Sequence, residues 1–498
     1  MWGLAFEEHV RIERVVAPRA DIALFVGWVA WRARALPGPI RDWLETRRYA
    51  LPGAGDPLPF DLPVPVESWE SFDGLFDWRA RRIDAAQPQA RADAMLGIAV
   101  RDFFANGGRK CYVIPLAAPW PVTQVPTDAE RSARLQALLP DFVDNARETW
   151  RGLVHLRGLD DVALVLLPDL PAVVAGAPQR LAPSAAADPP AEVFVECGTH
   201  AEPPAGTPGI LRLPAPRSDD AGYAAWNTFV GRVAAFLRRF RSEAMLLLAI
   251  PLPGDRALAA RSLFDAVTVD SAFVQLAYPW LRSTLPPRVP EGLIAPDGAL
   301  AGLVAGGALS QGAFRSVAGR RPVSTFNVEP IPPADELRTP RPGFEHRAWS
   351  SRLALFGPTL RGIELLSDRT STRNASWRQA GVGRLMGQLL RLARRVGEEL
   401  AFEASGEALW TRIRERFEDL LTALWQLGAL KGASPAQAFD VRCGRDVMTQ
   451  SDLDAGRVIC VVSFTPALAI DRIRVHLALA EDGSVVWSDD TAQVEALP

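Results

Sequence analysis

The chain has 498 residues and a formal net charge of -3. This length exceeds what a single hydrophobic core usually holds, so we expect several domains. Hydrophobic residues make up 48% of the chain and charged residues 23%, a composition that excludes a disordered chain and favours packed cores. The charge balance lacks the basic excess of a nucleic-acid-binding protein, so we expect no nucleic-acid partner.

Membrane insertion and secretion are not expected either. The longest apolar run, residues 22–31, is about half as long as a membrane span. Glu7 and Glu8 stand where a signal peptide would need an apolar stretch. The four cysteines are Cys111, Cys197, Cys443 and Cys460. Their spacing fits no metal site, and free thiols are typical of a reducing compartment. The sequence therefore predicts a soluble, cytoplasmic protein.

Strand-like and helix-like segments alternate over the first 175 residues. The apolar runs 21–27 and 161–168 predict buried strands, and residues 63–66 predict a short extended piece. Ser68 is placed to cap a helix that begins at Trp69. Strands separated by helices are typical of an α/β layer arrangement.

Asn106, Gly107 and Gly108 raise the question of a phosphate-binding loop. Such a loop needs a strand before its glycines and a helix after them. Here a helical pattern ends at Phe104 and an apolar, strand-like segment begins at residue 111. The reversed order predicts the end of a helix, whose carbonyl groups Arg109 and Lys110 would complement.

The middle of the chain is less regular. Residues 176–215 are rich in alanine and proline, which indicates a linker or a surface excursion. The next segment predicts a helix whose apolar face holds Trp226, Val230, Val233 and Phe236. Residues 244–250 predict a buried strand. Residues 286–345 are rich in proline and glycine, and we expect irregular surface structure there.

The last third of the chain shows the clearest periodicity. Residues 378–402 and 405–427 predict two long helices, and Gly428 is placed to end the second. The second helix carries an apolar stripe formed by Leu409, Ile413, Phe417, Leu420, Leu424 and Leu427. Residues 457–464 and 473–479 predict strands. We therefore expect two helices packed on a small sheet.

A search for catalytic residues yields one weak candidate. The sequence contains no Walker A motif, no nucleophile elbow and no paired metal-binding histidines. Cys443 lies near Arg442 and Arg445, a setting that activates a thiol, but no histidine lies nearby in sequence to act as its base. We expect no catalytic, cofactor-binding or metal-binding residues and no cofactor.

Arginines recur along the predicted helix 378–402. They are Arg384, Arg391, Arg394 and Arg395. One interpretation is a solvated face that nearby glutamates balance. The other is a surface that meets an acidic partner, because guanidinium groups suit carboxylate contacts better than ammonium groups do.

Three C-terminal motifs carry a family resemblance. They are the turn G-A-L-x-G at 428–432, the segment A-F-D-V-R-C ending at Cys443, and M-T-Q-x-D-x-D-A-G-R at 448–457. Residues 408–479 closely resemble the C-terminal domain of contractile tail sheath proteins from phages and phage-like injection systems. Residues 22–27, 64–76 and 96–114 are similar to N-terminal elements of that family. Residues 362–368 depart from it where the family usually has W-G-A-R-T-L.

The resemblance implies a mixed α/β, multi-domain tail-sheath fold. The expected divisions are an N-terminal arm (1–20), an α/β region (21–175), a variable middle region (176–345), a C-terminal sheath domain (346–470) and a C-terminal arm (471–498). It implies a structural subunit, not an enzyme, that polymerises as hexameric rings around an inner tube and contracts to drive the tube through a target envelope. Its partners would be copies of itself, the inner tube protein, and baseplate and cap proteins. A non-contracting tail component, such as a tube or cap protein, and a soluble enzyme are the alternatives.

Both ends of the chain read as strands. Val10 and Ile12 alternate with polar residues near the N-terminus, and Ile473, Val475, Leu477 and Leu479 do so near the C-terminus. The resemblance implies that such arms, from neighbouring subunits, complete a sheet on a third subunit. Asp482 and Gly483 predict a hairpin turn that folds residues 485–487 back on the terminal strand. In such a sheath, Arg391, Arg394 and Arg395 would face an acidic inner tube.

Overall fold

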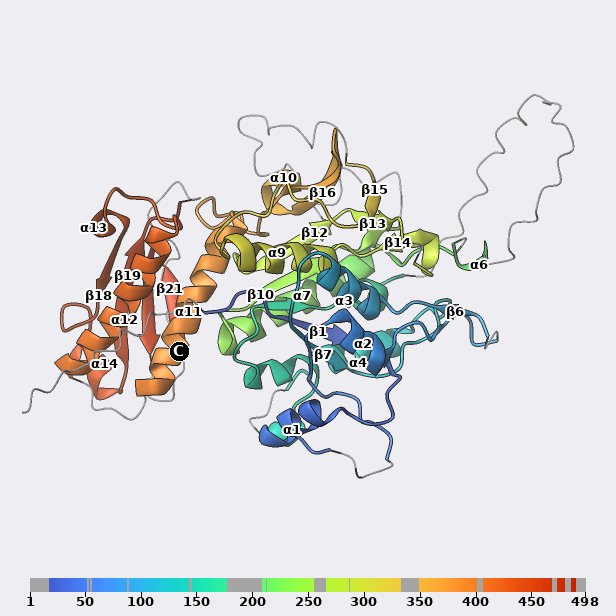
Figure 1. Ribbon diagram of the computed structural model, residues 1–498, viewed down its shortest axis with the longest axis horizontal. Coiled ribbons are helices and arrows are strands. Elements are labelled where there is room, and N and C mark those ends of the chain that lie inside the picture. The colour runs from blue at the N-terminus through green and yellow to red at the C-terminus, as the bar shows by residue number, and fades with distance from the viewer. Residues whose placement is uncertain are drawn as a thin grey trace, which may run out of the picture. The chain divides into compact units, whose positions relative to one another are not determined.

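A computed structural model gives the fold (Figure 1). It describes residues 18–51, 53, 56–86, 89–142, 146–176, 208–211, 213–254, 266–285, 287–332, 349–400, 406–467, 473–479 and 485–489. The chain divides into two units. The large unit comprises residues 20–387, and the C-terminal unit comprises residues 388–498 together with 1–19. This division falls later in the chain than the boundary expected at residue 346.

An eight-stranded sheet forms the centre of the large unit. Its order is β17 (Gly362–Ser367), β16 (Ala354–Thr359), β12 (Val274–Tyr278), β10 (Met245–Ala249), β8 (Leu164–Leu166), β1 (Ala23–Gly27), β7 (Cys111–Pro115) and β3 (Val64–Val66). The six inner strands are parallel, and β17 and β3 pair antiparallel at the two edges. Residues 346–387, which we expected in the C-terminal domain, thus contribute two strands to this sheet.

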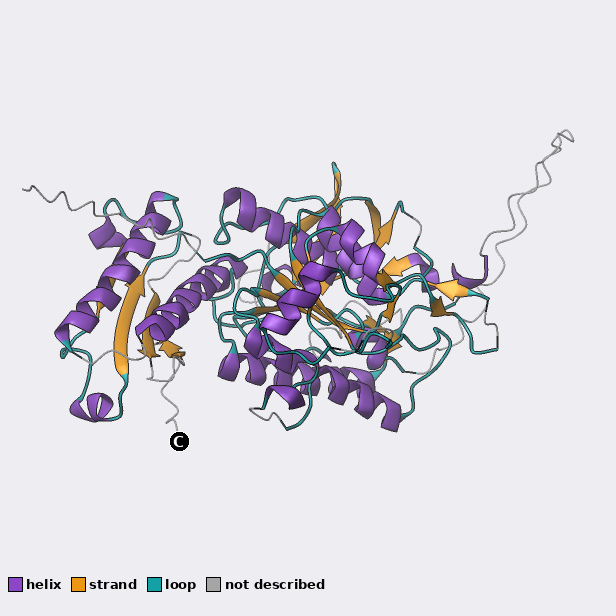
Figure 2. Ribbon diagram, turned by 60° about the horizontal axis from the view of Figure 1, so that its bottom comes forward, coloured by secondary structure: helices purple, strands orange, loops and turns teal. Residues whose placement is uncertain are grey.

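Helices cover both faces of this sheet, as Figure 2 shows. One apolar core lies beneath α2 (Trp69–Leu75), α3 (Met95–Ala105) and α9 (Asp297–Gln311). The other lies beneath α7 (Asp220–Phe240) and the 3-10 helix η2 (Gly152–Gly158). Parallel strands covered on both faces must be apolar throughout, which is why the continuous apolar runs correctly predicted β1, β7, β8 and β10.

The remaining elements of the large unit are short or peripheral. The helices are α1 (Gly38–Thr46), α4 (Asp128–Leu138), η1 (Arg147–Thr149), α5 (Leu170–Val173), α6 (Pro208–Leu211), η3 (Pro290–Gly292) and α10 (Trp349–Arg352). The strands are β2 (Ala30–Trp31), β4 (Phe76–Asp77), β5 (Arg81–Arg82), β6 (Arg91–Ala92), β9 (Arg217–Ser218), β11 (Leu252–Pro253), β13 (Trp280–Ser283), β14 (Leu293–Ile294) and β15 (Thr325–Glu329). Most of the linker expected at 176–215 lies outside the described residues.

The helix end predicted at Asn106 is confirmed. Helix α3 stops at Ala105, Gly107 has a φ of +110°, and β7 follows. The Asn106 side chain donates to the carbonyl of Asp102 over 2.8 Å, so it serves the helix end itself. The expectation for Lys110 is wrong, because its ammonium group pairs with Asp161 over 2.8 Å instead.

The expectation of irregular surface structure over residues 286–345 is also wrong. Helix α9 occupies the middle of this region and is buried over most of its length. An added Cβ at Gly298 would lie 2.4 Å from the carbonyl oxygen of Ala99, and one at Gly302 would lie 2.5 Å from that of Phe103. The glycines therefore allow α9 to pack directly on the backbone of α3.

The C-terminal unit consists of helices on a four-stranded sheet, as expected. The helices are α11 (Ala380–Leu400), which begins in the large unit, α12 (Glu407–Gln426), α13 (Pro435–Ala438) and α14 (Gln450–Asp454). The sheet is antiparallel, in the order β18 (Phe439–Arg442), β19 (Val458–Phe464), β20 (Ile473–Leu479) and β21 (Val485–Asp489). Helix α12 lies against β18.

The predicted apolar stripe of α12 is confirmed except at its end. Leu409, Ile413, Phe417, Leu420 and Leu424 are buried. Leu427 is 60% exposed, because the helix ends at Gln426 and Gly428, with a φ of +76°, turns the chain away.

Candidate functional site: the terminal sheet and a buried clamp

The described residues contain no group of three or more His, Cys, Asp or Glu side chains that could hold a metal ion. Cys443 is 7% exposed and lies beside Cys460, so the thiol is packed in the interior of the C-terminal unit. Over the same residues, no helix is both long and apolar enough to cross a bilayer.

The sheet of the C-terminal unit has two free edges in the described chain, β18 and β21. Strand β20 lies in its interior. It pairs with β19 from Val458↔Leu479 to Phe464↔Ile473 and with β21 from Val475↔Asp489 to Leu479↔Val485. The predicted return of residues 485–487 onto the terminal strand is thereby confirmed, whereas Asp482 and Gly483 lie outside the described residues.

The four apolar residues predicted on the terminal strand share one face. Ile473, Val475, Leu477 and Leu479 are all buried. Within the single chain this strand is thus part of a packed sheet and leaves no edge unpaired. Val10 and Ile12 lie outside the described residues. The described chain begins at Pro18, whose carbonyl accepts a hydrogen bond from Gln388 of α11 over 3.2 Å.

Only some of the arginines predicted to form a positive surface on α11 are exposed. Arg384 is buried inside the large unit, at 4% exposure, which corrects its expected place on a solvated surface. Arg391 is 8% exposed, Arg394 is half-buried and Arg395 is exposed. Of the three arginines assigned to a tube-facing surface, Arg394 and Arg395 are therefore the accessible ones.

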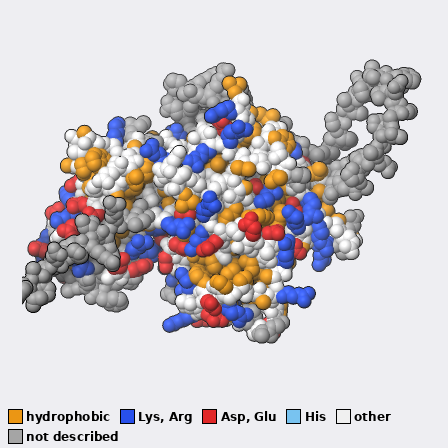
Figure 3. All heavy atoms as spheres, viewed as in Figure 1, with side chains coloured by type: hydrophobic (Ala, Val, Ile, Leu, Met, Phe, Trp, Pro, Cys, Tyr) orange, Lys and Arg blue, Asp and Glu red, His pale blue; other side chains and the backbone are white. Residues whose placement is uncertain are grey.

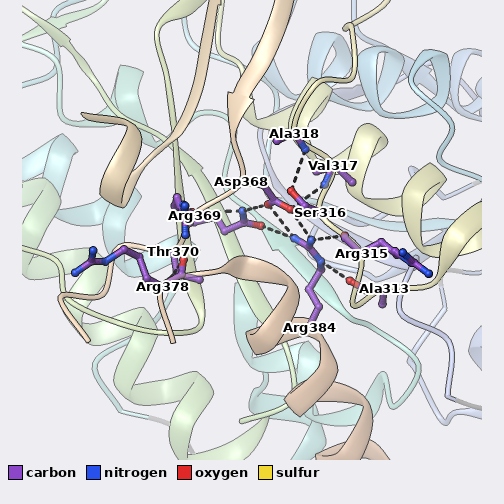
Figure 4. A network of polar contacts seen from close by, with 11 residues as sticks. Ala313, Arg315, Ser316, Val317, Ala318, Asp368, Arg369, Thr370, Arg378 and Arg384 are labelled. Carbon is purple, nitrogen blue, oxygen red and sulfur yellow. Dashed lines mark hydrogen bonds and ion pairs between the residues drawn. The ribbon is translucent and has the colours of Figure 1, made fainter. Parts of the chain in front are cut away.

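A buried clamp surrounds Arg384 (Figure 4). Its guanidinium group donates to both carboxylate oxygens of Asp368, over 3.1 and 2.6 Å. It also donates to the carbonyl groups of Ala313 and Arg315, over 2.7 and 2.9 Å. Arg384 thus ties the end of β17 to the loop that follows α9.

Asp368 is fully satisfied in turn. It accepts hydrogen bonds from the Val317 backbone N–H over 3.0 Å and from the Gln275 amide over 2.8 Å. Burial acts to raise the pKa of Asp368, but the Arg384 charge and these hydrogen bonds outweigh it and hold the pKa below its usual range. The carboxylate is therefore charged throughout the neutral range.

Two further carboxyl groups, those of Asp169 and Asp297, are buried in the large unit. Asp169 accepts the Trp28 backbone N–H over 2.9 Å, and burial raises its pKa to about 6. Asp297 begins α9 and is 0% exposed. Burial raises the pKa of Asp297 to about 7, and the charges of Asp169 and Asp102 add to this.

The Asp297 carboxylate lacks well-formed partners. Among the described residues, neither of its oxygens has a hydrogen bond of good geometry, although the N–H groups of Asp297 and Gly298 favour the charged form. A buried group of this kind costs free energy to ionise, and among the buried carboxyl groups of the described residues it is the one with both oxygens unpartnered. Sequence reasoning missed it because nothing in the local pattern distinguishes it from a helix-starting aspartate.

An α/β unit with a mainly parallel sheet, followed by a unit of helices on a four-stranded antiparallel sheet, defines a mixed α/β, multi-domain protein. The chain has the fold of contractile tail sheath proteins. No protein-family profile and no curated protein sequence matches it.

Three solved structures illustrate the likeness. The anti-feeding prophage helical sheath in its contracted state has 19% identity and a TM-score of 0.54, with 94% of this chain and 96% of that chain covered. The contracted PVC sheath complex of an extracellular contractile injection system has 17% identity and a TM-score of 0.53, with 94% of each chain covered. The contracted anti-feeding prophage baseplate has 19% identity and a TM-score of 0.56, with 95% and 97% covered.

Proposed function

We propose that this protein is the subunit of a contractile sheath, which polymerises as hexameric rings around an inner tube and contracts to drive that tube through a target envelope. The supporting observation is that the likeness to contracted sheath structures extends over nearly the whole length of both chains, through both units. The role is mechanical, and the work comes from rearrangement of the lattice. Baseplate and cap proteins are the further partners, and assembly takes place in the cytoplasm.

The surface of the chain suits repeated contact with other copies. Figure 3 shows hydrophobic side chains gathered on the visible face of the large unit, between α1 and α2, with both signs of charge around them. Contiguous exposed apolar surface commonly marks a protein contact. A tube or cap protein of non-contracting type would also polymerise, so contraction itself must be observed to separate these roles.

Purified chain should form helical tubes or rings that sediment rapidly and are visible by negative-stain electron microscopy. A small soluble oligomer under all conditions tested would favour the enzyme alternative instead.

The linkage between subunits is proposed to use strand exchange. Residues 465–472 join β19 to the hairpin β20–β21. In the proposed exchange, β20 pairs with β19 of a neighbouring subunit in the same register that it has with β19 of its own chain. An exchanged strand gains backbone hydrogen bonds without a large rigid interface. Val10 and Ile12 would add a further strand at a free edge of this sheet, and the described chain that begins at Pro18 is tethered to α11.

A pair of engineered cysteines tests the exchange. Ile459 and Ala478 are directly paired and half-buried. Ile459→Cys and Ala478→Cys, introduced together in a chain with Cys443→Ala and Cys460→Ala, should crosslink within one chain in the monomer. In assembled tubes they should crosslink between chains and give a ladder on a non-reducing gel. A monomer band alone from well-formed tubes would contradict exchange of this strand, and each single cysteine variant is the control.

The tube-facing surface is proposed to lie on α11. Arg394 and Arg395 are its accessible members, and Arg391 lies one turn earlier on the same helix. Arg394→Glu with Arg395→Glu should prevent sheath assembly around a co-expressed tube protein, because guanidinium–carboxylate contacts become repulsive. Arg416→Glu, an exposed change on α12, is the matched control. Normal assembly of the double variant would rule out this surface.

A further inference from the structure

Two of the cysteines lie opposite each other across neighbouring strands. Strands β18 and β19 pair from Phe439↔Phe464 to Arg442↔Val461. In this antiparallel register, the next residue of each strand is Cys443 on one side and Cys460 on the other. The end of the strand pair therefore places two thiols face to face.

Both thiols point to the buried side of the sheet. Phe439 and Val441 precede Cys443 at alternate positions and are buried, and Cys460 is opposite the buried Leu477 on its other side. Cys443 is 7% exposed and Cys460 is 0% exposed. Two effects raise the pKa of the Cys460 thiol: the larger is a hydrogen bond with Cys443, and the next is burial. The strand register and this interaction place the two thiol groups close together.

The backbone geometry suits a covalent bond. Directly opposite residues of an antiparallel pair have Cα atoms roughly 4.5 to 5.5 Å apart. A disulfide spans Cα separations of about 4.4 to 6.8 Å. No other described cysteine offers such a partner, since Cys111 is buried on β7 in the large unit.

We propose that Cys443 and Cys460 form a modification site, a cross-strand dithiol that a low-molecular-mass disulfide such as oxidised glutathione converts to a disulfide. The more exposed Cys443 thiolate attacks one glutathione sulfur, and one glutathione thiol leaves. The Cys460 thiolate then attacks Sγ of Cys443 and releases the second glutathione thiol. Two protein thiols are oxidised, one glutathione disulfide is reduced, and the two thiol protons end on the two glutathione molecules.

The bond would fasten one edge of the terminal sheet. Strand β18 is an edge strand, and Cys443 lies where it ends (Figure 1). A disulfide there closes a loop that contains α14 and joins the edge to β19. A reducing cytoplasm keeps the pair open, and exposure to an oxidising medium closes it. This inference does not depend on the proposed function.

Tryptic mapping of the intact chain tests the site. The folded protein is incubated with oxidised glutathione at mildly alkaline pH, which increases the thiolate fraction, and free thiols are then alkylated. Cleavage after Arg442, Arg445, Arg457 and Arg472 isolates the peptides 443–445 and 458–472. The expected product is these two peptides joined, with a mass about 2 Da below their sum because two hydrogens are lost.

Single substitutions provide the controls. Cys443→Ser and Cys460→Ser should each abolish the joined peptide, whereas Cys111→Ser should leave its yield unchanged. The oxidised protein should also unfold at a higher temperature than the reduced one, and this difference should vanish in Cys443→Ser. Alkylation of both cysteines in oxidised protein, under conditions that fully oxidise dithiothreitol, would overturn the proposal. So would a joined peptide that contains Cys111 or Cys197 instead.

Discussion

Asp368 and Arg384 form an ion pair of 2.6 Å with side chains only 0% and 3% exposed. One lies at the end of β17 and the other in the first turns of α11 (Figure 4). Removing two charges from water costs free energy, and further hydrogen bonds offset this cost. Val317 and Gln275 donate to Asp368, and Arg384 donates to two backbone carbonyl groups. The pair anchors the first turns of α11 within the large unit.

Asp368→Asn should destabilise the large unit by about 3 to 5 kcal/mol, because it leaves Arg384 charged and buried without its partner. The measurement is urea denaturation followed by tryptophan fluorescence. Glu418→Gln breaks the exposed pair with Arg414, which spans 3.8 Å, and should change stability by about 0.5 kcal/mol or less. Equal effects of the two substitutions would contradict the role given to the clamp.

The clamp also predicts a response to acid. The pKa of Asp368 is lowered in the folded state, so its contribution is present above the pKa of an unfolded aspartate. That contribution is lost as the pH falls through the lower folded pKa. The stability difference between wild type and Asp368→Asn should therefore shrink in acid, and a difference that grows in acid would contradict the assignment.

The packing of α9 on α3 predicts opposite effects for two glycine substitutions. Gly298→Ala should cost about 1 to 3 kcal/mol, since the new Cβ would overlap the backbone of Ala99. Gly231→Ala, in the exposed side of α7, meets no atom within 4 Å and should stabilise the protein by up to about 1 kcal/mol. Thermal unfolding of both variants measures the difference. Equal effects would show that α9 does not need its close approach.

The contribution of Asp297 to stability should depend on pH in the opposite sense to that of Asp368. Burial raises its folded pKa to about 7, above the ordinary value of 3.8, so its favourable contribution is complete below the unfolded pKa and disappears as the pH rises through about 7. Asp297→Asn should match wild type near pH 4 and exceed it near pH 8, by a difference on the order of 4 kcal/mol. Urea denaturation at several pH values measures this. Asp454→Asn changes an exposed position, and its free energy of unfolding should equal that of wild type at every pH. If the difference in free energy of unfolding between Asp297→Asn and wild type did not change with pH, the assignment would be contradicted.

Removal of the N-terminal segment separates folding from assembly. Deletion of residues 1–16, which contain Val10 and Ile12, should leave a folded protein that does not form tubes, because the proposed linkage needs this segment as a donated strand. Deletion of residues 490–498 should have little effect, since β21 ends at Asp489. Circular dichroism reports folding and sedimentation reports assembly. Tubes formed by the first variant would show that the N-terminal arm is not a linkage.

The spacing of apolar residues predicted the strands that are fully buried and the helices that are buried along one stripe. Strands β1 and β10 are fully buried and are continuous apolar runs, and α12 buries one stripe of its surface. Helix α9 could not be predicted in this way. It is apolar and rich in small residues all round, so it shows no alternation between apolar and polar faces, and its glycines resemble loop signals.

The candidate sites were harder to predict than the fold. Arg384 was expected on a positive face, because its partner Asp368 is 16 residues away in sequence and only the fold brings them together. The contact of Cys443 with Cys460 depends on strand register, which local patterns do not specify. The tube-facing and inter-subunit residues concern contacts between chains, and their roles stay predictions.

The most direct measurement of the central proposal is electron microscopy of this chain co-expressed with its inner tube protein, before and after a contraction trigger such as acid or denaturant. The proposal predicts helical sheaths around a tube in two states, a long narrow one and a short wide one, with the tube protruding from the second. Sheaths of one fixed length and diameter, or a small oligomer that never encloses the tube, would contradict it.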